Sequence, residues 1–135
     1  MTLSKFSDYA FRILILLGNN PDNTFTVDSI SQTLNLSNHH IKKIVYKLAT
    51  EGYIESIKGR NGGIRLGKNP CDINLGELLK ITEDNLNLVE CFSKDNNTCN
   101  ISSSCKLKGV IGYALNSFMK VFDDYTLADV LDKKK

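Results

Sequence analysis

Residues 26–50 constrain the fold more than any other part of the chain, because they hold two short helical patterns joined by a turn. Thr26 is a suitable cap for the first helix and Ser37 for the second, since each hydroxyl can accept a hydrogen bond from a free backbone N–H. Apolar residues recur at helical spacing, so each helix should bury one face. The expected buried residues are Val27, Ile30 and Leu34 in the first helix, and Ile41, Ile44, Val45 and Leu48 in the second. The opposite face of the second helix is polar and basic, with His39, Lys43, Tyr46, Lys47 and Thr50.

A basic β-hairpin is predicted directly after these helices. Residues 53–58 alternate as a strand, residues 59–63 have the turn sequence GRNGG, and residues 64–68 form the return strand. Asn-Gly is a strong short-range hairpin signal. Two short helices with a turn between them indicate a helix-turn-helix, and the hairpin makes it a winged helix with Arg60 at the tip of the wing. The predicted fold class is therefore mainly α with a small β-hairpin wing.

Helices are also predicted on both sides of this region. One covers residues 4–18, and a small one covers residues 74–82. The longest covers residues 106–123, and Thr126 with Asp129 suggests a capping box for a last short helix. These elements suggest a winged helix-turn-helix DNA-binding domain over residues 1–82, with a cysteine loop and dimerisation helices over residues 83–135.

The long helix has more apolar surface than a thin C-terminal unit needs. Its apolar residues recur over about four turns, which implies a partner helix. They are Leu107, Val110, Ile111, Ala114, Leu115, Phe118, Val121 and Phe122. Two-fold dimers are the commonest oligomers, so a homodimer is the expected partner arrangement.

Basic residues gather in one region of a nearly neutral chain. Residues 38–68 have a net charge of +5, from seven Lys or Arg against two Glu, whereas the whole chain has +2, so the rest of the chain has −3. A solvated helix face can also be basic. The hairpin that follows favours the other interpretation, in which this region binds a polyanion, namely double-stranded DNA.

Three of the four cysteines lie in one polar segment, residues 90–107. Cys91, Cys99 and Cys105 are separated by seven and five residues of mostly Asp, Asn, Ser and Thr. Such a loop has little to pack, so a bound group would explain its order. Thiolates hold iron–sulfur clusters, whereas structural zinc sites usually show closer cysteine pairs. Free thiols and disulfides are the other readings of this spacing. The fourth cysteine, Cys71, is expected to be an isolated thiol.

The N-terminus does not resemble a signal peptide, and the apolar run at residues 13–17 is too short to span a bilayer. A cytoplasmic protein with no membrane partner is therefore expected, which disfavours disulfides. No nucleophile–base pair or phosphate-binding loop is evident in the sequence. The chain is accordingly not expected to be an enzyme.

Several segments resemble the winged-helix iron–sulfur transcriptional regulators. These segments are residues 6–12 (FSDYAFR), 38–45 (NHHIKKIV) and 52–66 (GYIESIKGRNGGIRL). Residues 89–92 (VECF), 99–108 (CNISSSCKLK) and 125–129 (YTLAD) are similar to the nitric-oxide-sensing repressors within that family, and less so to its cluster-assembly regulators. The resemblance covers nearly the whole chain in the same order.

The resemblance implies a homodimeric repressor that binds a palindromic operator and has one iron–sulfur cluster per subunit. The matching ligands are Cys91, Cys99, Cys105 and Asp8 of the partner subunit. The gap between Cys91 and Cys99 is longer than in some relatives, although a 4Fe–4S cluster remains favoured over 2Fe–2S. Nitric oxide is the implied signal, and loss of ligation would free Asp8 to pair with Arg12, one helical turn away.

The DNA contacts are expected from both parts of the winged helix. Asn38, His39, Lys42 and Lys43 should enter the major groove, with Ser37 beside them, and Lys47 should contact phosphate. Arg60 and Asn61 should reach the minor groove from the wing. Two other classes of function stay open at this point, namely an interaction module with structural zinc and a thiol-based redox repressor. Iron and acid-labile sulfide analysis would distinguish them from a cluster protein.

Overall fold

Three helices pack together in the N-terminal half of the chain. The structure is a computed structural model that describes residues 1–133, so Lys134 and Lys135, at the end of the predicted C-terminal unit, lie outside the described residues. The helices are α1 (Lys5–Asn19), α2 (Val27–Leu34) and α3 (Asn38–Thr50). Ser4, Thr26 and Ser37 cap them by accepting hydrogen bonds from backbone N–H groups three residues on. The caps predicted at Thr26 and Ser37 are therefore confirmed.

The turn between α2 and α3 depends on a left-handed residue. Asn35 has φ 56°, a conformation that asparagine tolerates better than most residues, and its backbone N–H bonds the carbonyl of Ser31. The chain therefore leaves α2 abruptly, and α3 begins three residues after Asn35. The resulting helix-turn-helix agrees with the sequence analysis.

The wing is a two-stranded antiparallel hairpin with one further backbone bridge on the outer side of its second strand. Strands β1 (Ile54–Ile57) and β2 (Gly63–Leu66) pair with Ile54 opposite Leu66, and both are shorter than predicted. Phe25 adds a bridge on the other side of β2, because its backbone N donates to the Ile64 carbonyl at 2.9 Å and its carbonyl accepts from the Ile64 N–H at 2.7 Å. Gly63 has φ +151°, and a Cβ there would lie 2.9 Å from the Phe25 carbonyl oxygen, so this bridge requires glycine.

The core forms where the three helices meet the hairpin. Its fully buried side chains from the helix-turn-helix include Ile30, Ile41, Ile44 and Leu48, as predicted. Val45 is only partly buried, so the predicted inner face of α3 is narrower than the apolar spacing indicated. The long helix α1 supplies the other wall of this core. Its buried apolar residues are Ala10, Ile13, Leu14 and Leu17.

The rest of the chain leaves this core and returns to it. Its elements are η1 (Pro70–Asp72), α4 (Leu75–Thr82), η2 (Glu90–Phe92), α5 (Lys106–Asp123) and η3 (Leu127–Val130). The C-terminal end of α5 is attached to α4, since Asn74 Nδ2 donates to the Asp123 carbonyl at 2.7 Å and the Leu75 N–H donates to the Tyr125 carbonyl at 3.0 Å. After α5 the chain re-enters the core, where Leu127 is 0% exposed.

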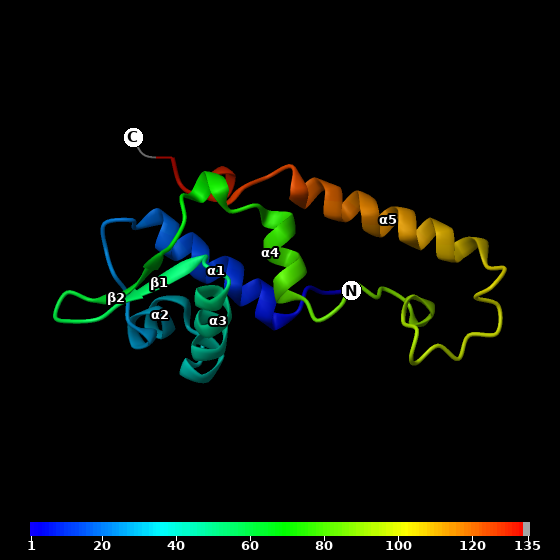
Figure 1. The fold of residues 1–135 in the computed structure, drawn as a ribbon, viewed down its shortest axis with the longest axis horizontal. Helices are drawn as coiled ribbons and strands as arrows, with labels where there is room; N and C mark the ends of the chain where they lie inside the picture. Colours follow the sequence, from blue (N-terminus) through cyan, green and yellow to red (C-terminus); the bar gives the residue numbers. More distant parts are fainter. Residues whose placement is uncertain (134–135) are drawn as a thin grey trace.

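The wing and the cysteine loop lie at opposite ends of the molecule (Figure 1). The helix α5 extends from the helical core toward the loop, which is drawn in yellow. The division of the chain at residue 82 stays a prediction. Leu127 of η3 belongs to the same core as the residues of α1 and α3, so part of the predicted C-terminal unit packs on the N-terminal one. Within residues 1–133, no helix combines the length and the apolar character needed to cross a membrane.

Candidate functional site

The outer face of α3 is exposed along its length. His39, Lys42 and Lys43 are exposed, and Tyr46 is 76% exposed, whereas Ile41 and Leu48 on the inner face are 0% exposed. The inner face holds the helix in place and leaves the basic outer face available to a groove of DNA. This is the arrangement that a recognition helix requires.

Two of the predicted DNA-binding residues on α3 have partners within the chain. Asn38 Nδ2 donates to Asp28 Oδ1 of α2 at 2.8 Å, so its amide is oriented before any contact with DNA. Lys47 Nζ lies 3.5 Å from Glu51 Oε1, and this salt bridge keeps Lys47 beside the helix. Ser37 is occupied as the cap of α3, accepting from the His40 N–H at 3.3 Å.

The wing has one paired and one unpaired arginine. Arg65 Nε lies 2.6 Å from Glu55 Oε1 across the hairpin. Arg60 and Asn61 are exposed at the tip, and no carboxylate of the described chain lies within ion-pair distance of Arg60. The tip of the wing therefore exposes a positive charge that has no ion-pair partner in the described chain.

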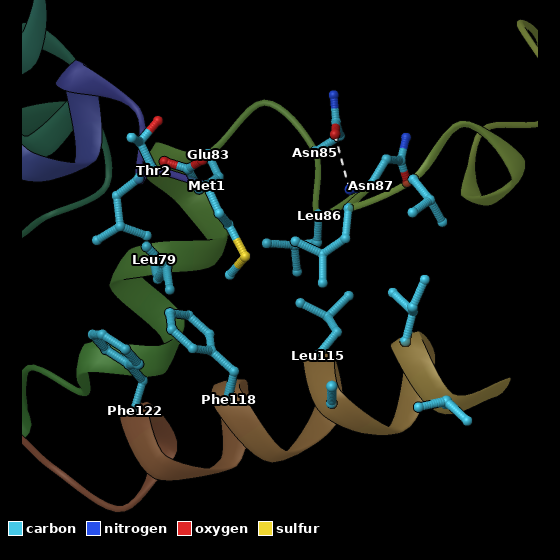
Figure 2. Close-up of a pocket in the computed structure, with 16 residues that line it drawn as sticks. Met1, Thr2, Leu79, Glu83, Asn85, Leu86, Asn87, Leu115, Phe118 and Phe122 are labelled. Atoms are coloured by element: carbon cyan, nitrogen blue, oxygen red, sulfur yellow. Dashed lines mark hydrogen bonds between the residues drawn. The ribbon is translucent and has the colours of Figure 1, made fainter. Parts of the chain in front are cut away.

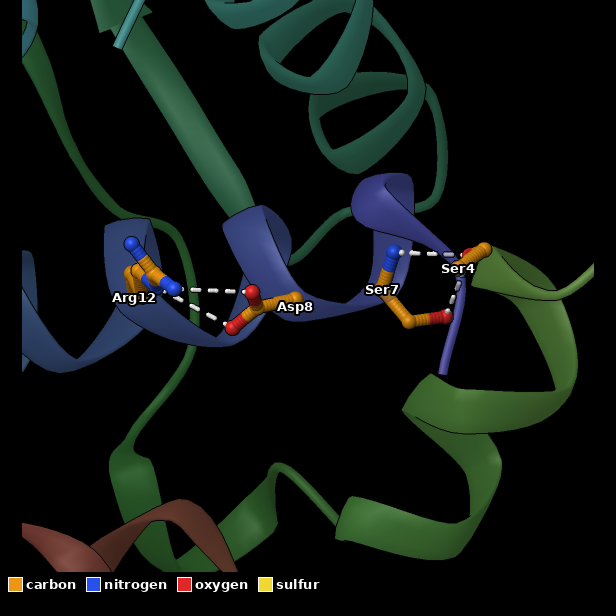
Figure 3. A network of polar contacts seen from close by, with 4 residues as sticks. All are labelled: Ser4, Ser7, Asp8 and Arg12. Atoms are coloured by element: carbon orange, nitrogen blue, oxygen red, sulfur yellow. Dashed lines mark hydrogen bonds and ion pairs between the residues drawn. The ribbon is translucent and has the colours of Figure 1, made fainter. Parts of the chain in front are cut away.

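Asp8 and Arg12 form a bidentate ion pair on the surface of α1 (Figure 3). Arg12 Nε and one terminal nitrogen donate to the two carboxylate oxygens of Asp8 at 3.0 and 2.8 Å. The pair is about half exposed, at 49% for Arg12 and 44% for Asp8. Pairing between these residues, one helical turn apart, was expected for the state in which Asp8 has no other partner.

A polar network fixes the start of α1 against the end of α4. Glu83 Oε2 accepts hydrogen bonds from the Ser4 N–H at 3.1 Å and from the hydroxyls of Ser4 and Ser7. Ser7, which is fully buried, also bonds the Thr82 hydroxyl at 2.7 Å. Burial raises the pKa of Glu83, but the hydrogen bonds from Ser4 and Ser7 outweigh it and lower the pKa below its ordinary value. Sequence reasoning missed this network, because its members lie more than 70 positions apart.

The three loop cysteines are free thiols, with Cys99 exposed and Cys91 and Cys105 half-buried. Between residues 1 and 133, no three His, Cys, Asp or Glu side chains converge as a metal site would require, and Asp8 does not join the loop cysteines of its own chain. The expected convergence is thus absent from the single subunit. Cys71, also free and exposed, lies outside this loop, within η1.

One interaction nevertheless joins two of the cysteine positions. Glu90 Oε1 accepts from the Thr98 N–H at 2.8 Å and from the Thr98 hydroxyl, and these bonds lower the pKa of Glu90. Because Glu90 precedes Cys91 and Thr98 precedes Cys99, these hydrogen bonds hold the two ends of the segment between Cys91 and Cys99 close together. Cys105 occupies the cap position of α5 with its side chain unused in capping. Three free cysteines in one loop are a donor set that suits a thiolate-bound group.

An apolar groove separates α5 from α4 and the N-terminus (Figure 2). Its volume is about 840 Å³, and it is lined by Met1, Leu79, Leu86, Leu115 and Phe118 among others. On α5, large side chains remain in solvent, both in the wall of the groove at Val110 and outside it. Leu107 is 60% exposed, Val110 63%, Tyr113 76% and Val121 58%. Met119, which is 7% exposed, is the one described residue of α5 that is buried, and the predicted apolar stripe did not include it.

Comparisons with known proteins agree with this geometry. A family model described as Rrf2, iron-dependent transcriptional regulator, matches residues 3–133. The HTH-type transcriptional regulator NsrR of Halalkalibacterium halodurans is 46% identical over 97% of this chain and 90% of the relative. The NsrR of Bacillus subtilis is 43% identical over 100% of this chain and 93% of the relative.

Solved structures are similar over the same extent. The structure of CymR, the global cysteine regulator of B. subtilis, has a TM-score of 0.76 and 27% identity, covering 96% of this chain and 95% of that one. The structure of T. potens IscR also has a TM-score of 0.76, at 22% identity, and covers 96% of this chain and 85% of that one. These similarities confirm the winged-helix fold.

Proposed function

Because the chain belongs to the Rrf2 family of transcriptional regulators, we propose that it is a repressor whose operator binding is controlled by an iron–sulfur cluster sensing nitric oxide. The family and the relatives are transcriptional regulators, which confirms that the chain is a DNA-binding regulator rather than an enzyme. The observation that supports the sensing function is the set of three free thiols in one loop of such a regulator.

The DNA is contacted from two elements. The outer face of α3 enters the major groove through Asn38, His39, Lys42 and Lys43, while Arg60 and Asn61 reach the minor groove. The exposure of these side chains supports this assignment. Lys47 contacts phosphate, for which it must leave Glu51, 3.5 Å away.

The repressor is a homodimer on a palindromic operator. The uncovered apolar residues of α5 support this, because monomers rarely expose so continuous a patch. Two-fold symmetry then places the half-sites roughly one helical turn, or a multiple of it, apart.

The cluster, 4Fe–4S rather than 2Fe–2S, is held by Cys91, Cys99, Cys105 and Asp8 of the partner subunit. The donor chemistry supports this set, since thiolates are the usual ligands of such clusters. When bound, the cluster supplies iron to which nitric oxide can add. A carboxylate oxygen is a hard ligand and the easiest of the four to displace. Displaced, Asp8 forms the ion pair with Arg12 that is present in the single subunit.

The decisive experiment is iron and acid-labile sulfide analysis of anaerobically purified protein. The proposal requires a brown protein with both elements, and Cys99→Ala should remove the chromophore. Cys71→Ala is the matched control, because it removes a free, exposed thiol outside the loop and should leave the spectrum unchanged. Stoichiometric zinc without iron, or full cluster content in Cys99→Ala, contradicts the proposal.

The role of Asp8 has a separate test. Asp8→Ala should give an altered or unstable cluster and a changed response of operator binding to nitric oxide. A variant with the wild-type spectrum, cluster lifetime and release from DNA removes Asp8 from the mechanism. The three cysteines would then still be the proposed cluster ligands, and the fourth ligand would be a group other than Asp8.

A further inference from the structure

Tyr9 lies between the Asp8–Arg12 ion pair and the recognition helix. On one side, Arg12 Cζ is 5.4 Å from the centroid of the Tyr9 ring, within the range of a cation–π contact. On the other side, the Tyr9 and His40 ring centroids are 5.7 Å apart with planes tilted by 44°. The contacts form an unbroken series from Asp8 on α1 to His40 on α3.

His40 connects this series to the part of α3 that meets DNA. It is the third residue of the helix, and its backbone N–H donates to the Ser37 cap at 3.3 Å. Its ring centroid lies 6.1 Å from that of His39, and the proposed base-contacting residues Asn38 and His39 directly precede it. A displacement of the His40 ring therefore acts on the first turn of the recognition helix.

We propose that Tyr9 and His40 are positioning residues that transmit the state of Asp8 to the recognition helix of the same chain. This inference rests on the proposed function in one respect, which is that Asp8 exchanges Arg12 for another partner. While Asp8 accepts two hydrogen bonds from Arg12, the guanidinium is held over Tyr9. When Asp8 is engaged elsewhere, Arg12 loses both bonds, and its contact with the Tyr9 ring changes.

The aromatic contact is better suited to this role than the packing beneath it. Ala10, Ile13 and Ile41 are 0% exposed and lie in a close-packed core that resists small displacements. Tyr9 is half-buried and His40 is exposed, so neither ring is enclosed on all sides as the core residues are. The two states of Arg12 thus differ beside an aromatic contact that joins α1 to α3 outside the fully buried core.

The contact can be observed without the cluster, because the chain has two histidines and hence two sets of imidazole signals in NMR spectra. Spectra of cluster-free wild-type protein and variants are recorded at one fixed pH, so that only the substitution differs between them. Asp8→Ala and Arg12→Gln should each shift the His40 signals more than those of His39. In a Tyr9→Leu background the same changes should no longer reach His40. Unshifted His40 signals in both single variants overturn the inference.

The functional arm compares operator affinity with and without the cluster. The ratio of the two affinities should fall roughly 2- to 30-fold in Tyr9→Leu and in His40→Leu, while cluster content stays at the wild-type level. Tyr9→Phe keeps the ring and should keep the ratio. His40→Leu alters an exposed position, so it remains informative should Tyr9→Leu fold poorly. A wild-type ratio in both leucine variants overturns the inference.

A matched control exists elsewhere in the chain. Lys68 Nζ lies 4.5 Å from the centroid of the Tyr53 ring, so Lys68→Ala removes a comparable cation–π contact with no link to Asp8. It should leave the affinity ratio unchanged. If wild-type protein binds its operator equally with and without the cluster, the proposed function fails, and the NMR experiment still decides whether Asp8 and His40 are coupled.

Discussion

Helices α3 and α5 have similar amphipathic sequences and very different surroundings. In α3, the inner residues Ile41, Ile44 and Leu48 are at most 1% exposed, because α1, α2 and the hairpin cover them. In α5, which has 18 residues, Val110 and Val121 remain 63% and 58% exposed. An apolar stripe therefore indicates that a helix face needs a cover, but it does not indicate which chain supplies the cover.

The largest effect is expected from a substitution in α3, the helix whose apolar face is covered. Leu48→Ala removes a fully buried side chain and should lower the free energy of unfolding by about 2–5 kcal/mol. Denaturant unfolding of the DNA-free protein measures this loss. Lys42→Ala, at an exposed position of the same helix, should stay within about 0.5 kcal/mol of wild type. A loss below about 1 kcal/mol at Leu48 would contradict the burial on which the comparison depends.

A substitution on the uncovered face of α5 should instead change how tightly two chains associate. Val110→Asp places a charge in the face proposed to meet a second copy, and an unpaired buried charge costs several kcal/mol. We expect the dimer dissociation constant to rise by about 100-fold, which corresponds to about 3 kcal/mol. Sedimentation equilibrium measures it. Asn116→Asp adds the same charge to an exposed polar position of α5 and should leave the constant unchanged, whereas equal effects of the two variants would place the interface elsewhere.

The difference between the two helices also explains what the sequence could predict. The Ser37 cap and the Asp8–Arg12 pair were predictable, because each joins residues three or four positions apart on one helix. The bond from Ser4 to Glu83 joins residues 79 positions apart, and only the tertiary fold brings them together. Hydrophobic period and cap residues are local signals, so they fix the helices and the hairpin but not their mutual contacts.

The cysteine loop shows the same limit. Its three thiols were recognised from their spacing, yet the bond between Glu90 and Thr98 that ties two of them has no signature in the pattern. Met119 was missed for a related reason. It lies outside the apolar stripe of α5, and its burial depends on the tertiary fold rather than on the spacing of apolar residues.

A smaller effect is expected at the polar network between the start of α1 and the end of α4. The lowered pKa of Glu83 means that its bonds to Ser4 and Ser7 stabilise the fold above the ordinary pKa of 4.5, and that this contribution disappears as the pH falls through the lower folded-state value. Glu83→Gln should remove that pH dependence and cost about 1 kcal/mol at neutral pH, since the carboxylate is only partly buried. Denaturant midpoints measured from pH 3 to pH 7 would show it. The neighbouring, exposed Asp84→Asn is the control, and an equal change there would argue against the network.

The smallest effect concerns the outer face of α3. Lys47→Ala should weaken binding to operator and random DNA alike and reduce the salt slope by about one, because a phosphate contact has no sequence preference. Fluorescence anisotropy at several salt concentrations measures both quantities. Arg60→Ala provides the contrast, as it should cost more on the operator than on random DNA. An unchanged slope in Lys47→Ala would mean that Lys47 stays with Glu51 in the complex.

The attachment of α5 at one end has a mechanical consequence. Its last turn is held to α4 through Asn74 and Asp123, whereas its first turn leads into the cysteine loop. Eighteen residues at about 1.5 Å each make a lever arm of about 27 Å. A rotation of about 10° at the joint with α4 moves the far end by roughly 5 Å, given that length. The arm thus converts a small change of angle beside the winged helix into a displacement at the loop that is large enough to make or break a bond.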